Sequence, residues 1–379
     1  MIPLSVPNIS GNEWQYVKEC LDTGWVSSVG SYVNKFEDII KDYTGAKFAI
    51  ATSNGTSALH IALQLSGVQA GDWVICPNIT FVASANSISY CGAKPLLIDI
   101  EEDTWQMDLK LLKKYLQKNT EIINNECVII ETGEVIRAIM PVHILGHLVD
   151  IKEVLKIAEE FHLKVVEDST EALGSFLDEK HAGTFGQFGT LSFNGNKILT
   201  TGGGGIIMTN DEDLAKKAKH LTTQAKASVS EYFHDETGYN YRLVNILAAI
   251  GVAQMEQLPE FLKVKKRISE RYLEAFKDDN NIIFQKQLFG SKPNNWLYTI
   301  RVNDKNGLIG YLKENQIEAR PFWVPMNSLP MFKDSFYVSE KDFSHLIYDS
   351  CVSIPCSTSL SPEDQEQVIL KIFEFYGKN

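Results

Sequence analysis

The sequence predicts an α/β protein with a mostly parallel sheet, and two observations support this fold class. Apolar, β-branched runs alternate with helix-patterned segments up to about residue 250. Several of these runs are apolar throughout instead of alternating, as expected of strands that helices cover on both faces. Beyond that point the pattern changes. We therefore predict a large domain over residues 1–250 and a smaller α+β domain over residues 251–379.

The elements can be placed in order from these patterns. In the large domain, the predicted strands are Lys47–Ala51, Trp73–Cys76, Lys94–Asp99, Ile136–Val142 and Lys164–Glu167. The predicted helices lie between or after them and are Ser57–Leu65, Ala83–Tyr90, Ile151–Glu160 and Asp211–His220. In the small domain we expect a long helix Ala253–Phe276, an apolar run Trp296–Val302, a helix Gly307–Asn315 and a loop Arg320–Phe332 rich in proline and aromatic residues. Strands that alternate with helices in this way favour parallel pairing.

Composition and charge exclude several classes of protein. The chain has 379 residues, of which 44% are hydrophobic and 22% are charged, as in folded soluble proteins. Its net charge of −12 disfavours nonspecific binding to nucleic acid or to an anionic membrane. No apolar stretch approaches the roughly 20 residues that span a bilayer, and we expect no signal peptide. The six cysteines form no CxxC motif, so we expect reduced thiols in a cytoplasmic protein.

Lys197 and Asp168 are the first candidates for catalysis. Lys197 has apolar neighbours, Phe193 on one side and Ile198-Leu199 on the other, and a partly desolvated amine on a short strand can form a Schiff base. Asp168 follows an apolar run, at the place where α/β sheets bind ligands, and its carboxylate would keep a pyridine nitrogen protonated. Each residue also has a simpler interpretation, as a surface lysine and a helix-capping aspartate.

A third candidate is the segment Gly55-Thr56-Ser57, between a predicted strand and a predicted helix. Glycine lets an anion approach the backbone, and the free N–H groups of a helix start can donate to phosphate. The alternative is an ordinary helix start that Ser53 or Asn54 caps. Together, an amine, an acid at a strand end and a phosphate-binding helix start are what a pyridoxal phosphate (PLP) enzyme requires.

Other side chains near the predicted strand ends are weaker candidates. Phe81 follows a strand and can stack on a cofactor ring, although a core phenylalanine is the simpler interpretation. His143 ends another strand and is equally compatible with a structural role. The glycine run 202–205 lacks the Gly-Lys-Ser/Thr of a P-loop, so we interpret it as a turn beside Lys197. The histidines are scattered without metal-ligand spacing, so no metal site is expected.

Five motifs, in this order along the chain, resemble those of a known family. They are Asn54–His60, Pro77–Ala83, Glu167–Ala172, Ser192–Lys197 and Gly238–Arg242. From about Pro3 to its C-terminus, the chain is similar to the DegT/DnrJ/EryC1/StrS family of PLP-dependent sugar aminotransferases. The resemblance implies the fold-type I aminotransferase architecture, with a mostly parallel seven-stranded sheet and a smaller C-terminal α+β domain. It also implies a homodimer with active sites at the subunit interface.

The family pattern assigns roles to the residues that match it. Lys197 would form the Schiff base and shuttle the proton, and Asp168 would pair with the pyridinium. The remaining cofactor contacts that the resemblance implies are Gly55, Thr56 and Ser192 at the phosphate, Asn240 of the neighbouring subunit at the same group, Phe81 on the ring and Glu171 at the ring hydroxyl. The family often has Gln or His at the Glu171 position, and a carboxylate donates a hydrogen bond only when protonated. Gly203 stands where many members have glutamate, a departure that concerns the sugar pocket.

The resemblance also suggests a substrate. Segments 194–205 and 319–327 look most like the legionaminic acid branch, in which the substrate is a UDP-linked 4-keto-6-deoxy-N-acetylhexosamine. A nucleoside diphosphate needs cationic and aromatic partners. The expected substrate-binding residues are Arg320, Trp323, Tyr32 in the early loop, and His143. For Arg320 a surface salt bridge is the alternative. Glutamate is the expected amino donor, and bacterial surface glycan or nonulosonic acid biosynthesis is the expected setting.

Other functions remain open on the sequence. A GDP-perosamine-type 4-aminotransferase and a dTDP-sugar 3-aminotransferase use the same chemistry, so the nucleotide, the aminated carbon and its stereochemistry are undecided. Related dehydratases have histidine at the lysine position, and Lys197 argues against that class. A non-enzymatic PLP-binding regulatory protein would lack a working half-reaction. The presence of both Asp168 and Lys197 disfavours it.

Overall fold

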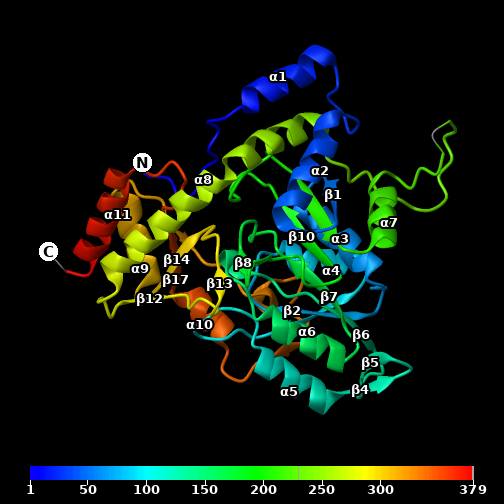
Figure 1. Cartoon of the computed structure of the whole chain (residues 1–379). Coiled ribbons are helices and arrows are strands. Elements are labelled where there is room, and N and C mark those ends of the chain that lie inside the picture. The colour runs from blue at the N-terminus through cyan, green and yellow to red at the C-terminus, as the bar shows by residue number, and fades with distance from the viewer. Residues whose placement is uncertain (229, 378–379) are drawn as a thin grey trace.

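The computed structural model describes residues 1–228 and 230–377, and a ten-stranded sheet lies at its centre (Figure 1). Its strands are β1 (Phe48–Thr52), β2 (Trp73–Pro77), β3 (Lys94–Ile98), β4 (Thr120–Ile123), β5 (Glu126–Ile129), β6 (Val135–Ile139), β7 (Lys164–Asp168), β10 (Phe188–Ser192), β11 (Gly205–Thr209) and β16 (Tyr337–Val338). Seven of them form one layer in the order β1-β11-β10-β7-β6-β2-β3. In this layer every pair is parallel except the two that β11 makes. The predicted mostly parallel α/β fold is confirmed; β16 and the β4–β5 hairpin extend it.

Helices cover both faces of this layer. The helices are α2 (Ser31–Thr44), α3 (Gly55–Leu65), α4 (Ala83–Tyr90), α5 (Leu109–Asn119), α6 (Ile151–Glu160), α7 (Glu212–Thr222) and α8 (Asn245–Phe276). On β2, Val74 packs with α3 and α4, whereas its neighbour Ile75 packs with α5 and α6. On β1, Ile50 packs with α3 and α7, whereas Ala49 packs with α2 and α8. Strands buried on both sides need apolar residues at every position, which explains their continuous apolar sequence.

The C-terminal part of the chain forms a second, antiparallel sheet. Its strands pair in the order β12-β14-β17-β15. Their bounds are β12 (Ile282–Phe284), β14 (Tyr298–Val302), β15 (Arg320–Pro321) and β17 (Cys351–Ile354). The helices here are α9 (Lys305–Glu314), α10 (Phe343–Ser350) and α11 (Pro362–Phe375). The last turns of α8 pack into the same core, so this helix connects the two sheets.

Smaller elements complete the structure. A three-stranded sheet pairs β13 (Ser291–Lys292) with β8 (Phe176–Leu177), and β8 with β9 (Lys180–His181). Helix α1 (Glu13–Thr23) lies along α8, and two 3-10 turns cover Ile144–Gly146 and Met326–Ser328 (Figure 1). Among the described residues, no helix has the length and apolar character to cross a membrane.

The predicted domain boundary between residues 250 and 251 falls inside α8. The N-terminal segment contacts the C-terminal part, because Ile2 pairs with Ile317 and the Leu4 carbonyl accepts a hydrogen bond from the Cys356 N–H. In the other direction, β16 joins the central sheet beside β3. The chain therefore passes between the two parts at least three times. The division at residue 250 stays a prediction.

The elements predicted from the sequence lie within a few residues of the observed ones. Helix starts follow their capping residues: the side chains of Asp108, Asp150 and Asp211 each accept an N–H of the first turn of α5, α6 and α7. The predicted long helix is confirmed but begins eight residues earlier, at Asn245. Helices α1, α2 and α5 and the hairpin β4–β5 were not predicted. All six cysteines are free.

Candidate active site

A cavity of about 500 Å³ lies at the carboxyl ends of the parallel strands, where α/β proteins bind ligands. Most of its wall comes from four parts of the chain: the start of α3, Phe81 with the start of α4, the ends of β7 and β10 with the turns that follow, and C-terminal residues 296–297 and 320–323. Leu4, Ser5, Leu145 and Ser353 complete it. Among the residues predicted from the sequence, the wall includes Gly55, Thr56, Phe81, Asp168, Glu171, Ser192, Lys197, Gly203, Arg320 and Trp323. Motifs dispersed through the sequence therefore meet at one place.

Lys197 lies in a turn between β10 and β11, not on the short strand that the sequence suggested. The Lys197 N–H donates to the Asn194 carbonyl at 3.0 Å, which closes the turn. The amine Nζ lies 3.9 Å from the ring centroid of Trp296 and 3.7 Å from Oε1 of Glu171. Burial lowers the pKa of the Lys197 amine, although the carboxylates of Glu171 and Asp168 act in the opposite direction. A lowered pKa favours the neutral amine, which is the nucleophilic form.

Glu171 is the buried acid beside this amine. Its Oε2 accepts a hydrogen bond from the Leu145 N–H at 2.8 Å. Burial raises the pKa of Glu171 to about 7, against the opposing effects of the Lys197 ammonium group and the Leu145 N–H. Near neutral pH the carboxyl group therefore exists in both protonation states. A protonated Glu171 can donate a hydrogen bond, as a residue at the ring hydroxyl of PLP must when that oxygen is ionised.

The ring of Trp296 packs against the amine of Lys197, and three contacts hold Trp296 in place. Its Nε1–H donates to the Asn196 carbonyl at 2.6 Å, and its ring stacks on Trp323 with a centroid distance of 6.4 Å. Its carbonyl accepts from Nζ of Lys265 at 2.7 Å. Lys265 is buried in α8, and burial lowers the pKa of its amine. Neither residue could be predicted from the sequence, because a core tryptophan and a helical lysine have no distinctive local pattern.

Asp168 is buried at the end of β7, as predicted. Two hydroxyl groups orient its carboxylate: Ser84 Oγ donates to Oδ2 at 2.7 Å, and Thr170 Oγ1 donates to Oδ1 at 2.7 Å. Both of these residues line the cavity. A carboxylate fixed in this way can pair with a protonated pyridine nitrogen. Sequence reasoning missed Ser84 as a partner because it lies on α4, 84 positions from Asp168 in the sequence. It also missed Thr170, which lies only two positions after Asp168.

The start of α3 combines both interpretations that the sequence left open. Asn54 caps the helix, because its Oδ1 accepts a hydrogen bond from the Ser57 N–H at 2.8 Å. Gly55, Thr56 and Ser192 nevertheless line the cavity beside the cap. A Cβ atom on Gly55 would lie 2.8 Å from Cβ of Ser192, so glycine allows this close approach of helix and strand. N–H groups of a helix start and two hydroxyls make a donor set that fits the phosphate of PLP.

Aromatic and basic side chains form other parts of the wall. Phe81 is 51% exposed and lines the cavity, so it is not the core residue of the simpler interpretation. Trp323 and Arg320 come from the loop that the sequence predicted to be rich in proline and aromatic residues. The Arg320 guanidinium group donates to Oε1 of Glu318 at 2.6 Å, and its side chain is 65% exposed. An exposed pair of this kind costs little to rearrange, so Arg320 can turn toward an anionic ligand.

Three predicted site residues do not line the cavity of the single chain. Tyr32 lies on α2 rather than in a loop; it is buried, and its hydroxyl donates to Glu19 at 2.7 Å. His143 is fully buried, with Nε2 3.0 Å from Oε2 of Glu167, so the structure shows the structural interpretation of this histidine. Asn240 is exposed on the segment that leads into α8. Exposure there leaves its side chain accessible to another molecule.

One group of possible metal ligands lies outside the cavity. Within the described ranges, His220, Asp235 and Glu236 are the residues whose ligand atoms lie within 4.8 Å of one another. They lie at the surface, and Lys217 already pairs with Glu236. None of them lines the cavity.

Comparisons with known proteins agree with this geometry. The model of the DegT/DnrJ/EryC1/StrS aminotransferase family matches residues 7–373. The GDP-perosamine synthase of Escherichia coli O157:H7 is 37% identical, and the match covers 99% of each chain. The putative pyridoxal phosphate-dependent aminotransferase EpsN of Bacillus subtilis is 36% identical, over 97% of this chain and 94% of that protein. A DegT DnrJ EryC1 StrS aminotransferase from Brucella abortus superposes with a TM-score of 0.89 at 27% identity, over 97% and 96% of the two chains.

Proposed function

We propose that this chain, which belongs to the DegT/DnrJ/EryC1/StrS aminotransferase family and is a PLP-dependent sugar aminotransferase, aminates carbon 4 of a 4-keto-6-deoxy sugar. The sugar is linked to a nucleotide, and we propose that this nucleotide is GDP. The observation that carries the proposal is the cavity, whose wall includes Lys197, Asp168 and the start of α3 together with aromatic and basic side chains. That wall suits a ligand with a diphosphate and a base.

GDP takes the place of the UDP that the sequence resemblance favoured. The similarity to a GDP-perosamine synthase extends over 99% of both chains, whereas the resemblance to the legionaminic acid branch rests on segments 194–205 and 319–327. We give the similarity to the GDP-perosamine synthase more weight because it extends over the whole chain and not over two short segments. A UDP-linked sugar remains the second candidate because of those segments.

The residues of the chain divide the chemistry among them. When bound, PLP supplies an electron-withdrawing ring and carries the amino group between donor and acceptor. Asp168, oriented by two hydroxyls, keeps the ring nitrogen protonated. Lys197, as a neutral amine, would accept the proton from the α-carbon of the amino donor and pass it to the cofactor. In the second half-reaction it would take a proton from the cofactor and deliver it to carbon 4 of the sugar. Glu171 lies 3.7 Å from that amine and holds or releases a proton near neutral pH.

Glutamate is the amino donor in this proposal, and the enzyme is a homodimer. Asn240 is exposed and does not line the cavity of its own chain. The role that the family pattern gives it, at the phosphate of the neighbouring subunit, is compatible with both facts. Each active site would then contain residues of two chains.

Binding of nucleotides tests the choice of carrier. We expect GDP to bind the PLP-loaded enzyme at least tenfold more tightly than UDP or dTDP, as measured by isothermal titration calorimetry. Arg320→Ala should weaken GDP binding, whereas Arg267→Ala, a change away from the cavity wall, should not. Tighter binding of UDP would replace the carrier, and failure of all three nucleotides to bind would reject a nucleotide-linked substrate.

A further inference from the structure

Two wall segments of the cavity come from distant parts of the sequence. Residues 78–84 leave β2 and carry Phe81 and Ser84, which face the cavity. Residues 320–327 leave β15 and carry Trp323 into the same cavity. Since Ser84 donates to the carboxylate that pairs with the cofactor, the first segment belongs to the cofactor side. The second segment belongs to the substrate side.

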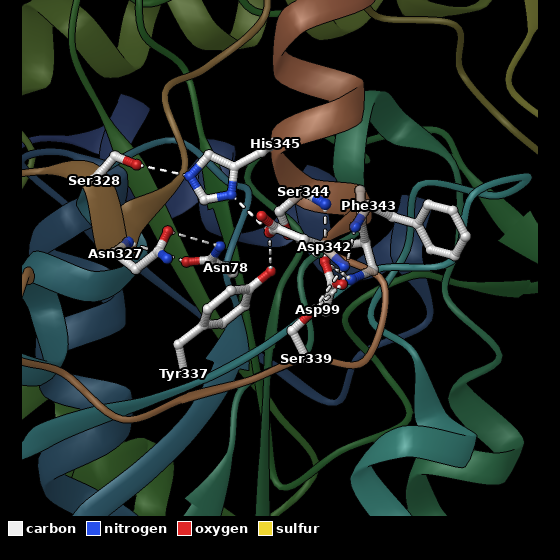
Figure 2. A network of polar contacts seen from close by, with 11 residues as sticks. Asn78, Asp99, Asn327, Ser328, Tyr337, Ser339, Asp342, Phe343, Ser344 and His345 are labelled. Atoms are coloured by element: carbon white, nitrogen blue, oxygen red, sulfur yellow. Dashed lines mark hydrogen bonds and ion pairs between the residues drawn. The ribbon is translucent and has the colours of Figure 1, made fainter.

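A reciprocal pair of side-chain amides joins these segments across 249 positions of sequence (Figure 2). Nδ2 of Asn78 donates to Oδ1 of Asn327 at 3.0 Å, and the Asn327 N–H donates to Oδ1 of Asn78 at 3.0 Å. The Met326 N–H donates to the Asn78 carbonyl at 2.7 Å, and the Asn78 N–H donates to Ile98 at 2.7 Å. Asn78 is 0% exposed. A buried amide loses its partners only at a cost, so this contact fixes both segments.

The chain beyond Asn327 is anchored separately. Oγ of Ser328 lies 2.8 Å from Nε2 of His345, and Nδ1 of His345 lies 2.6 Å from Oδ1 of Asp342. The Tyr337 hydroxyl also donates to Asp342, at 2.7 Å (Figure 2). Asp99, at the end of β3, accepts from the N–H groups of residues 343 and 344. These contacts hold the chain after the loop but do not reach Asn78.

The loop is held firmly at its start as well. Arg320 and Pro321 pair with Ser353 and Val352 of β17. Between this strand and Asn327, the backbone N–H of residue 322 donates to the Cys351 carbonyl at 3.3 Å. The amide pair, together with the bond from the Met326 N–H to the Asn78 carbonyl, therefore ties the far end of the loop to the cofactor side of the cavity.

We propose that Asn78 and Asn327 are positioning residues that set the distance between the cofactor wall and the substrate wall, and thereby set the affinity for the sugar nucleotide. The inference rests on the proposed function, in that the loop 320–327 contacts the nucleotide-linked substrate. A loop that is ordered before binding loses no conformational freedom when the ligand binds. Without the Asn78–Asn327 pair, the loop would have to become ordered when the sugar nucleotide binds, and this loss of conformational freedom would weaken binding. Glutamate is too small to depend on the far end of the loop.

The test compares three variants at position 327. Asn327→Ala removes the side-chain acceptor and should raise the KM for the sugar nucleotide about tenfold, with the KM for glutamate changed less than twofold. Asn327→Asp keeps an oxygen that accepts from Asn78 and should restore most of the affinity. Asn303→Ala is the matched control, because Nδ2 of Asn303 makes a comparable 3.2 Å amide bond to Asn281 in the C-terminal part. That control should leave both KM values unchanged.

Hydrogen exchange of the free enzyme, read by mass spectrometry, provides a second measurement that needs no substrate. Asn327→Ala and Asn78→Ala should speed exchange in residues 320–328, and Asn303→Ala should not. Unchanged exchange in that segment, or equal increases of both KM values, would overturn the positioning role. If no nucleotide bound the wild-type enzyme, the proposed substrate would fall, while the exchange result would still decide whether the amide pair orders the loop.

Discussion

At the scale of single residues, the main feature of the site is the pair formed by the Lys197 amine and the Glu171 carboxyl group. Lys197 is half-buried and lies 3.7 Å from the buried Glu171, and burial lowers the pKa of the amine and raises the pKa of the carboxyl group, which favours the neutral form of each. A buried ion pair is stable only when other interactions offset the loss of hydration. Here the Trp296 ring contacts the Lys197 amine, but this interaction is weaker than hydration by water. Both shifts act in the direction that suits a lysine that alternates between nucleophile and acid.

Covalent attachment of the cofactor should occur at Lys197 alone. The neutral amine of the half-buried Lys197 is a nucleophile, whereas Lys265 is buried and its amine donates to the carbonyls of Trp296 and Cys356. Treatment of the PLP-loaded protein with borohydride should fix the cofactor to the peptide that contains Lys197, identified by mass spectrometry. Lys197→Ala should abolish turnover and this label. A label on Lys265 instead would contradict the assignment.

The stability of the cofactor-free protein should depend on Glu171 between about pH 4.5 and pH 7. Its folded pKa of about 7 lies above the ordinary value of 4.5, so the folded state holds a proton that the unfolded chain has released. The contribution of Glu171 to the free energy of unfolding is fully present below pH 4.5 and is lost as pH rises through 7. The total loss is on the order of 3 kcal/mol. Glu171→Gln should flatten this part of the profile of unfolding free energy. Glu270→Gln, at an exposed position, should leave it unchanged; a wild-type slope in Glu171→Gln would refute the pKa shift.

At the scale of elements, α3 shows how one helix start serves folding and ligand binding together. Asn54 caps the helix from outside, so the remaining first-turn N–H groups stay directed at the cavity. Gly55 permits β10 to approach, which places Ser192 beside them. The phosphate site is therefore a packing arrangement of a helix against a strand, rather than a loop that wraps a ligand.

Gly55→Ala should weaken cofactor binding about tenfold or more, because its new Cβ would lie 2.8 Å from Ser192 and push the strand from the helix. The dissociation constant of PLP from fluorescence titration of the cofactor-free protein measures this. Gly310→Ala is the control, since no atom lies within 4 Å of its Cβ and α9 should gain about 0.5–1 kcal/mol of stability. An unchanged affinity in Gly55→Ala would remove this glycine from the phosphate site.

The sequence predicted elements well where apolar periodicity and caps agree. The helices Ala83–Tyr90 and Ile151–Glu160 were predicted to the residue, because Asp150 or a turn marks each start. Helices α1 and α2 were missed, since their apolar positions face α8 and become a core only after folding. Lys197, Asp168 and Gly55 could be singled out because each lies in a local motif, and they do line one cavity, while their roles stay predictions. Trp296, Lys265 and Ser84 could not be singled out, since their place at the site depends on contacts between distant segments.

At the scale of the whole molecule, the site brings together two parts of the chain that α8 connects. The cofactor side belongs to the parallel sheet, and the substrate side includes residues 296–297 and 320–323. Small movements between these parts would change the width of the cavity. Contacts such as the Asn78–Asn327 pair therefore affect substrate affinity without touching the reacting atoms.

Subunit mixing tests whether two chains share each site. Lys197→Ala and Asn240→Ala chains should each be impaired alone. If Asn240 serves the neighbouring site, a mixed dimer has both lesions in one site and an intact second site. An equal mixture should then recover about a quarter of wild-type activity per chain. Mixing of Lys197→Ala with Asp168→Asn chains is the control, since both residues line one cavity and no recovery is expected. An active monomer, or no recovery after verified exchange, would reject the shared site.

The most direct measurement of the central claim is transfer of nitrogen from 15N-glutamate to a 4-keto sugar nucleotide. The PLP-loaded enzyme is incubated with the GDP-, UDP- and dTDP-linked 4-keto-6-deoxy sugars in turn, and the products are examined by mass spectrometry and NMR. The proposed function predicts that 15N appears at carbon 4 of the GDP-linked sugar, and that Lys197→Ala yields none. Appearance of 15N at carbon 3, selective amination of another carrier, or no transfer to any of the three would contradict it.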